Sequence, residues 1–150
     1  MKGSSFLSRV CLLWAGVVIG GSLIAAPSKF QVEELTMPVA LLVGRAQFGA
    51  VAVGEGILIG MGILGALLGL KFKRSTSGLS WGLFLGAVAI FLIQHLVLMG
   101  PLQERSERII AGEDIAQGSH HLVYIVVEVM KVGLLVLGGF WRVVRGGKTS

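Results

Sequence analysis

Four long apolar runs divide this chain, and each is long enough to cross a lipid bilayer as a helix. The runs extend from Phe6 to Ala26, Met37 to Leu70, Leu79 to Leu102 and Ser119 to Val144. About 20 apolar residues span the hydrocarbon core of a bilayer. Only 14% of the residues are charged, whereas soluble domains carry about 25%. We therefore expect an all-α polytopic membrane protein, a single antiparallel four-helix bundle over residues 1–150 with spans near 6–26, 48–70, 79–101 and 119–142.

The first run has two interpretations. It could be a secretory signal peptide, with Lys2 and Arg9 ahead of the apolar stretch and Ala25-Ala26 as the cleavage site. Cleavage after Ala26 would place Ile24 where a small residue is preferred. The run is also long enough to span the membrane, so a retained helix is the favoured interpretation.

The second run is longer than one membrane span requires. At ~1.5 Å per residue it would reach ~50 Å, well beyond a ~30 Å hydrocarbon core. Its early part contains Arg45 and Gln47, which we expect at the outer interface. We predict that Arg45 meets an acidic partner there, either Glu55 or the Glu33-Glu34 pair.

Basic residues gather on one predicted side of the membrane. The N-terminus, the second loop and the C-terminus together carry eight basic residues and no acidic residue: Lys2, Arg9, Lys71, Lys73, Arg74, Arg142, Arg145 and Lys148. The positive-inside rule then predicts that both termini are cytoplasmic in a multi-pass protein of the bacterial inner membrane. The even number of spans agrees with this orientation.

Glycine recurs at four-residue spacing in three of the spans. Membrane helices associate closely where small residues let their backbones approach. The pairs Gly16/Gly20, Gly56/Gly60, Gly65/Gly69 and Gly82/Gly86 therefore predict tight helix–helix contacts.

Polar side chains within the predicted spans are the best indicators of function, because a charge at the bilayer centre costs roughly 2.5–3.5 kcal/mol on insertion scales. At ~100° per residue, four of these side chains share one arc of the last span: His121, Tyr124, Glu128 and Lys131. By depth, most of them lie in the outer half of the membrane, which predicts an outward-facing polar pocket. The candidate ligand- or ion-binding residues are Arg45, Glu55, Gln94, His95, His121, Tyr124, Glu128 and Lys131.

These polar residues leave two interpretations open. They could bind a ligand, proton or ion, or they could form buried pairs that only fix the register of the helices. Glu128 and Lys131 are spaced i, i+3 and could pair directly. The four formal charges of Arg45, Glu55, Glu128 and Lys131 cancel, as the structural interpretation requires.

Catalytic and cofactor motifs are missing from the sequence. It contains no phosphate loop, nucleophile elbow, HExxH motif or cysteine cluster, so no catalytic residue is predicted and the sequence identifies no particular cofactor. His95, His120 and His121 are the only imidazoles that could hold a metal or haem. A nucleic-acid role has no support beyond the net charge of +5.

Two short elements resemble a known family. Ala26-Pro27 with Phe30 forms an Ala-Pro-x-x-Phe element, and Gly44-Arg45 with Phe48 forms a Gly-Arg-x-x-Phe element. The chain is similar in these to small uncharacterised four-helix bacterial inner-membrane proteins, a domain of unknown function with a His-led fourth helix. The resemblance implies the four-helix fold and no particular activity.

Three functional hypotheses follow from these patterns. The first is a membrane protein that binds or conducts a small ion, proton or polar ligand through its outward pocket. The second is a structural or accessory subunit whose polar stripe and glycines contact another copy or another membrane protein. The third is a membrane enzyme with a bound metal or haem.

Overall fold

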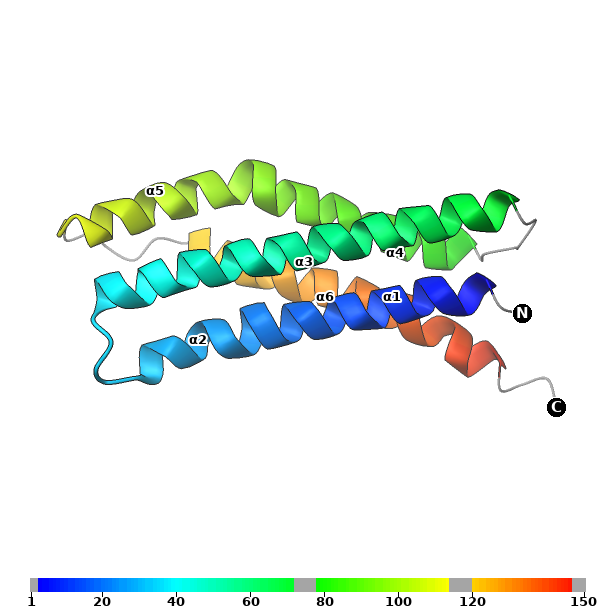
Figure 1. Cartoon of the computed structure of the whole chain (residues 1–150), viewed down its shortest axis with the longest axis horizontal. Coiled ribbons are helices and arrows are strands. Elements are labelled where there is room, and N and C mark those ends of the chain that lie inside the picture. The colour runs from blue at the N-terminus through cyan, green and yellow to red at the C-terminus, as the bar shows by residue number, and fades with distance from the viewer. Residues whose placement is uncertain (1–2, 72–77, 114–119, 147–150) are drawn as a thin grey trace.

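The computed structural model describes residues 3–71, 78–113 and 120–146, which form four long helical rods packed as an all-α bundle (Figure 1). The rods alternate in direction along the chain, so the bundle is antiparallel. The first rod contains α1 (Gly3–Val18), a π-helical segment (Ile19–Ala25), α2 (Ala26–Ser28) and a 3-10 turn (Lys29–Gln31). The second is α3 (Met37–Lys71), the third joins α4 (Gly78–Ile93), a π-helical segment (Gln94–Leu98) and α5 (Met99–Ile110), and the fourth is α6 (His120–Gly146).

All four rods are long and apolar enough to cross a membrane, as the sequence predicted. Large apolar side chains lie on the outside of the bundle, including Val53, Leu96 and Leu122 with exposed fractions of 64%, 80% and 65%. Charged side chains such as Glu55 and Lys131 are instead buried inside it. This inverted distribution suits a multi-pass membrane protein, whose surface faces lipid and whose polar groups must find partners internally.

The start of α1 and the end of α6 lie at the same end of the bundle (Figure 1). The turn between the first two rods and the tip of α5 lie at the opposite end, which we call the distal end. Near the termini α4 packs against α6, whereas toward the distal end α5 packs against α3. α1 packs against both α3 and α6 and so links the two sides of the bundle.

Two helices extend further than the sequence predicted. The first rod was expected to end at Ala26 but continues through Pro27 to Gln31, and the third was expected to close at Gly100-Pro101 but continues to Ile110. Each proline follows a π-helical segment and lies in the first turn of the next α-helix. The rod stays hydrogen-bonded across each junction, because Ala26 and Met99 donate their N–H groups to Gly21 and Gln94 in the π-helical segments. α3 is likewise one uninterrupted helix that includes Arg45 and Gln47.

Trp14 is the centre of the packed core. It is fully buried and makes edge-to-face contacts with Phe84 and Phe91, at centroid separations of 5.8 Å and 6.5 Å. Cys11 is buried one turn before it, on the same face of α1. Such aromatic pairs contribute about 0.5–1.5 kcal/mol beyond their buried area. The core therefore ties α1 to the third rod directly.

The glycine pairs do not mark the helix contacts as predicted. A Cβ added at Gly16, Gly20, Gly56, Gly60 or Gly82 would meet no atom within 4 Å, so these positions face open space within the described chain. Close approach occurs instead at other glycines, such as Gly62, where a Cβ would collide with the ring of Phe84, and Gly139, where it would collide with Leu12. Of the predicted glycines, Gly65 approaches Phe6 and Gly86 approaches Leu134. Four-residue spacing alone does not say which helix face is occupied.

Candidate functional site

Three ionisable side chains meet in the interior of the bundle. Nζ of Lys131 lies 2.5 Å from Oε1 of Glu55 and 2.9 Å from Oε2 of Glu128. None of the three is more than 2% exposed. Lys131 thus links a carboxylate one turn away on α6 to a carboxylate on α3. We call Glu55, Glu128 and Lys131 the charge cluster.

Two neutral side chains also donate hydrogen bonds to the charge cluster. Nε1 of Trp14 donates to Oε1 of Glu55 at 2.7 Å, and Nε2 of Gln94 donates to Oε2 of Glu128 at 2.5 Å. Lys131 also donates to Oε1 of Gln94 at 2.9 Å. The network therefore joins α1, α3, the third rod and α6 at one point. Hydrogen bonds of this kind are what buried charges need to be tolerated.

The formal charges of the cluster do not balance. Glu55 and Glu128 contribute two negative charges and Lys131 one positive charge, so the ionised cluster carries a net charge of −1. The sequence interpretation cancelled these charges with Arg45, but Arg45 lies elsewhere and binds a different carboxylate. The expected cancellation is therefore wrong.

The polar arc predicted for the last span is present on α6. Tyr124, Glu128 and Lys131 are buried, and Leu135 continues the same stripe. Alternating steps of four and three residues keep one helix face turned toward the bundle. His121 was also predicted on this arc, and His120 was a candidate metal ligand; the side chains of both lie outside the described part of the structure.

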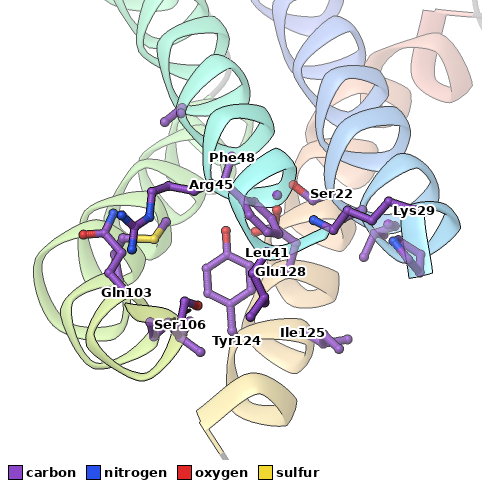
Figure 2. Close-up of a pocket in the computed structure, with 18 of the residues that line it drawn as sticks. Ser22, Lys29, Leu41, Arg45, Phe48, Gln103, Ser106, Tyr124, Ile125 and Glu128 are labelled. Atoms are coloured by element: carbon purple, nitrogen blue, oxygen red, sulfur yellow. Dashed lines mark hydrogen bonds between the residues drawn. The ribbon is translucent and has the colours of Figure 1, made fainter. Parts of the chain in front are cut away.

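A cavity of about 400 Å³ lies at the distal end of the bundle, beside the charge cluster (Figure 2). Figure 2 shows Lys29 and Tyr124 projecting into the space between the helices, with Arg45 turned toward Gln103. Glu128 lines the cavity as well as belonging to the charge cluster. The polar lining residues are Ser22, Lys29, Arg45, His95, Gln103, Ser106, Tyr124 and Glu128.

Three buried polar atoms at this cavity have no hydrogen-bond partner in the structure. They are Oγ of Ser22, Nε2 of His95 and Oε1 of Glu128. All three residues line the cavity, although they come from three different rods. Buried polar groups are nearly always hydrogen-bonded, so three orphaned atoms around one space indicate that a polar guest or water is needed there.

Lys29 is the buried cation of the cavity wall, whereas Arg45 is partly exposed and paired with Glu107. Lys29 is 9% exposed, and its Nζ lies 5.2 Å and 5.4 Å from the ring centroids of Phe30 and Phe48. Gly44 makes room for it, since a Cβ there would collide with Nζ. Among the described residues no carboxylate forms an ion pair with Lys29, so no counter-charge neutralises it at the cavity wall.

Arg45 does not bind the partner predicted from the sequence. Its Nη2 donates to Oε1 of Glu107 on α5 at 3.1 Å, with exposed side-chain fractions of 38% and 65%. Glu55 lies deeper in the bundle with Lys131, and so the predicted Arg45–Glu55 pair is wrong. The alternative partners Glu33 and Glu34 are not bound either. The third span was expected to end near residue 101. In the structure α5 continues to Ile110, and this continuation brings Glu107 to Arg45 on α3.

His95 stacks on Phe91 with ring centroids 4.2 Å apart. Its Nδ1 lies 2.9 Å from the carbonyl oxygen of Phe91, and because a carbonyl only accepts, Nδ1 must carry the hydrogen. In neutral His95 the orphaned Nε2 is then an acceptor. No group of three His, Cys, Asp or Glu side chains converges as a metal site within residues 3–71, 78–113 and 120–146, as far as their side chains are described.

Sequence reasoning missed two residues of the site. Trp14 lies within the first predicted span but was not singled out there, and Lys29 lies just beyond the predicted end of that span at residue 26. Continuing the helix beyond Ala26 in the prediction would have placed Lys29 on the inner face. Ser22, Ala26 and Lys29 are separated by four and three residues, which puts them on one helix face, and all three are buried. Trp14 left no comparable signal, since its partner Glu55 is on another helix.

The two elements of the family resemblance converge on the cavity. Ala26, Pro27 and Phe30 line it from the first rod, and Gly44, Arg45 and Phe48 line it from α3. No family model, curated protein or solved structure matches the chain.

Proposed function

We propose that this protein is a small-molecule binding protein of the membrane, whose distal cavity takes a polar ligand with an acidic group and an apolar body. The observation that carries the proposal is the set of three orphaned atoms, on Ser22, His95 and Glu128, around one cavity. A space that only needed to be filled with apolar side chains would not collect unsatisfied polar groups.

The chemistry of the wall supports the class of ligand. Lys29 supplies a buried positive charge that no described carboxylate neutralises. Leu23, Phe30 and Phe48 supply apolar surface on the same side. Pockets of about 300–1,000 Å³ with a few placed polar groups are typical of small-molecule sites. An acidic group would meet Lys29, and the apolar body would lie against the aromatic rings.

We propose further that the cavity faces outward from the cytoplasmic membrane of a bacterium, with both termini cytoplasmic. The eight basic residues at the terminal end support this orientation through the positive-inside rule. The common position of the two termini agrees with an even number of crossings.

Binding of small aromatic probes tests the proposal. The thermal unfolding temperature of the purified protein in lipid nanodiscs is measured with benzoate, benzyl alcohol and benzylamine. A ligand that binds only the folded state raises that temperature. We expect benzoate to give the largest increase, and we expect Lys29→Gln to remove its advantage over benzyl alcohol.

A cavity-filling variant provides the matched comparison. Gly49→Leu would place a side chain into the cavity, where Gly49 has no atom within 4 Å of its Cβ position. Gly56→Leu on the same helix adds the same side chain to an exposed face away from the cavity. Gly49→Leu should abolish the benzoate effect and Gly56→Leu should retain it. Equal responses in both variants would contradict the proposal.

The structural hypothesis remains the second candidate, because the charge cluster ties four rods together. In that case the cluster fixes helix register, with another copy of the chain or another membrane protein as the partner of the outer surface. The structural hypothesis predicts that each of the three probes changes the unfolding temperature of the wild-type protein no more than that of Gly49→Leu.

A further inference from the structure

The charge cluster holds one more carboxylate than it has cations. Within the part of the chain that the structure describes, Lys131 is the single cation paired with Glu55 and Glu128, and all three are enclosed by the bundle. An uncompensated charge in this setting is unfavourable, because burial removes most of the hydration that stabilises a charge. Binding of one proton changes the net charge of the cluster from −1 to zero.

The unoccupied oxygen of Glu128 is where a proton can enter. Oε2 of Glu128 already accepts from Lys131 and Gln94, whereas its Oε1 has no partner. In Glu55, Oε1 accepts from Lys131 and Trp14, and neither oxygen is among the buried atoms without a partner. Only Glu128 of the two carboxylates lines the cavity. Glu128 is therefore the member of the charge cluster that borders the cavity.

His95 provides an acceptor on the same cavity. Its Nδ1–H is committed to the carbonyl of Phe91, which leaves the Nε2 lone pair without a donor. A protonated Glu128 is a donor at Oε1, and a water molecule in the cavity could accept from it and donate to Nε2 of His95. The two orphaned atoms thus have complementary roles once Glu128 carries a proton.

We propose that the charge cluster is a proton-binding site, in which Glu128 exchanges one proton with water in the distal cavity. In uptake, a hydronium ion in the cavity transfers its proton to Oε1 of Glu128, an O–H bond forms, and a water molecule remains. Release is the reverse. The step needs no other reactant, and the site is independent of whether the cavity also binds an organic acid.

The surroundings of Glu128 determine what else could respond to pH. α3 contributes Glu55 and Arg45, the 3-10 turn contributes Lys29, and the third rod contributes His95 with Glu107 bound to Arg45. α6 contributes Tyr124 and Lys131, while the α1 neighbour in the cluster, Trp14, does not titrate. Substitution of each carboxylate separately, with an exposed carboxylate as control, isolates the contribution of the cluster.

Infrared spectroscopy of the purified protein in nanodiscs tests the proposal, through the carbonyl stretching band of a protonated carboxyl group. The wild-type protein should show one such band from the cluster. Glu128→Gln and Glu55→Gln should each remove it, because either leaves one carboxylate with one ammonium. Glu107→Gln, which changes an exposed carboxylate, should retain it. Lys131→Met should show two protonated carboxyls, if it folds.

Exchange into heavy water tests the route. The band should shift rapidly in the wild-type protein and more slowly in Gly49→Leu, where the cavity is filled. A band that is absent at every pH at which the wild-type protein stays folded would overturn the proposal. So would a band unchanged by Glu128→Gln, or a spectrum that responds to added sodium and not to pH. None of these outcomes depends on benzoate binding, so the two proposals can fail separately.

Discussion

The ammonium group of Lys131 lies 2.5 Å from Oε1 of Glu55, although the two residues belong to different helices. The sequence relates Lys131 more obviously to Glu128, which is one turn away on α6. Because Lys131 binds both carboxylates, it is the residue whose loss leaves most charge unpaired. The three members of the cluster should therefore differ in how much stability they contribute.

Lys131→Met should destabilise the fold far more than Glu128→Gln. Removing the cation leaves two buried carboxylates without a counter-charge, and breaking a buried ion pair in this way costs about 3–5 kcal/mol. Glu128→Gln leaves Glu55 and Lys131 as a balanced pair, so we expect a loss near 1 kcal/mol, the size of one hydrogen bond. Unfolding by SDS in mixed micelles measures the difference. Equal losses would show that the cluster is not held through Lys131.

Trp14→Phe tests the hydrogen bond that Trp14 donates to Glu55. Phenylalanine can keep the contacts with Phe84 and Phe91 but lacks the indole N–H. Loss of a buried hydrogen bond to a charged acceptor costs about 1.5–3 kcal/mol. Trp81→Phe is the matched control, because Trp81 also packs edge-on against Phe84, at 5.5 Å, without contacting the cluster. A similar loss of unfolding free energy in both variants would contradict this assignment.

The sequence predicted the polar face of α6 because that information is local. Tyr124, Glu128 and Lys131 follow helical periodicity within an apolar span, and a polar group there must turn inward. The number of spans was predictable for a similar reason, since length and hydropathy decide it. Neither prediction required knowledge of which helices are neighbours.

The partners of these residues could not be predicted, because pairing depends on how far each helix continues. Arg45 meets Glu107 only because α5 extends past Pro101 to Ile110. Lys29 reaches the cavity only because helical structure continues past Pro27. In both places the predicted span ended beside a proline. In the structure each proline lies in the first turn of an α-helix that follows a π-helical segment.

Arg45→Ala should cause little loss of stability. The Arg45–Glu107 pair is partly exposed, and pairs of this kind contribute about 0–1 kcal/mol. We therefore expect the amount of folded protein to stay close to wild type, contrary to what a buried Arg45–Glu55 pair would give. Glu107→Ala should behave like Arg45→Ala, and the double variant should add nothing further. A strong loss in Arg45→Ala alone would indicate another role for this guanidinium.

Cysteine labelling in intact cells should establish the orientation. Glu107→Cys, on exposed α5 at the distal end, should react with a membrane-impermeant maleimide added outside. Ser150→Cys, at the C-terminus, should react only after the membrane is permeabilised. Cys11 is fully buried and serves as an unreactive internal reference. Labelling in the reverse order would contradict the positive-inside assignment and would place the cavity on the cytoplasmic side.

Gly44→Ala tests whether the position of Lys29, and not only its charge, matters for binding an acidic ligand. A Cβ at residue 44 would collide with Nζ of Lys29, which is the flexible end of its side chain and would have to move. Alanine favours a helix over glycine by up to about 1 kcal/mol, so the fold should not suffer. We expect benzoate affinity to fall roughly three- to tenfold, or about 0.6–1.4 kcal/mol. Gly49→Ala is the control, because it adds the same methyl group to the same cavity where no atom lies within 4 Å. If both variants weaken benzoate binding equally, the effect is one of volume, and Lys29 is not the group that recognises the acid.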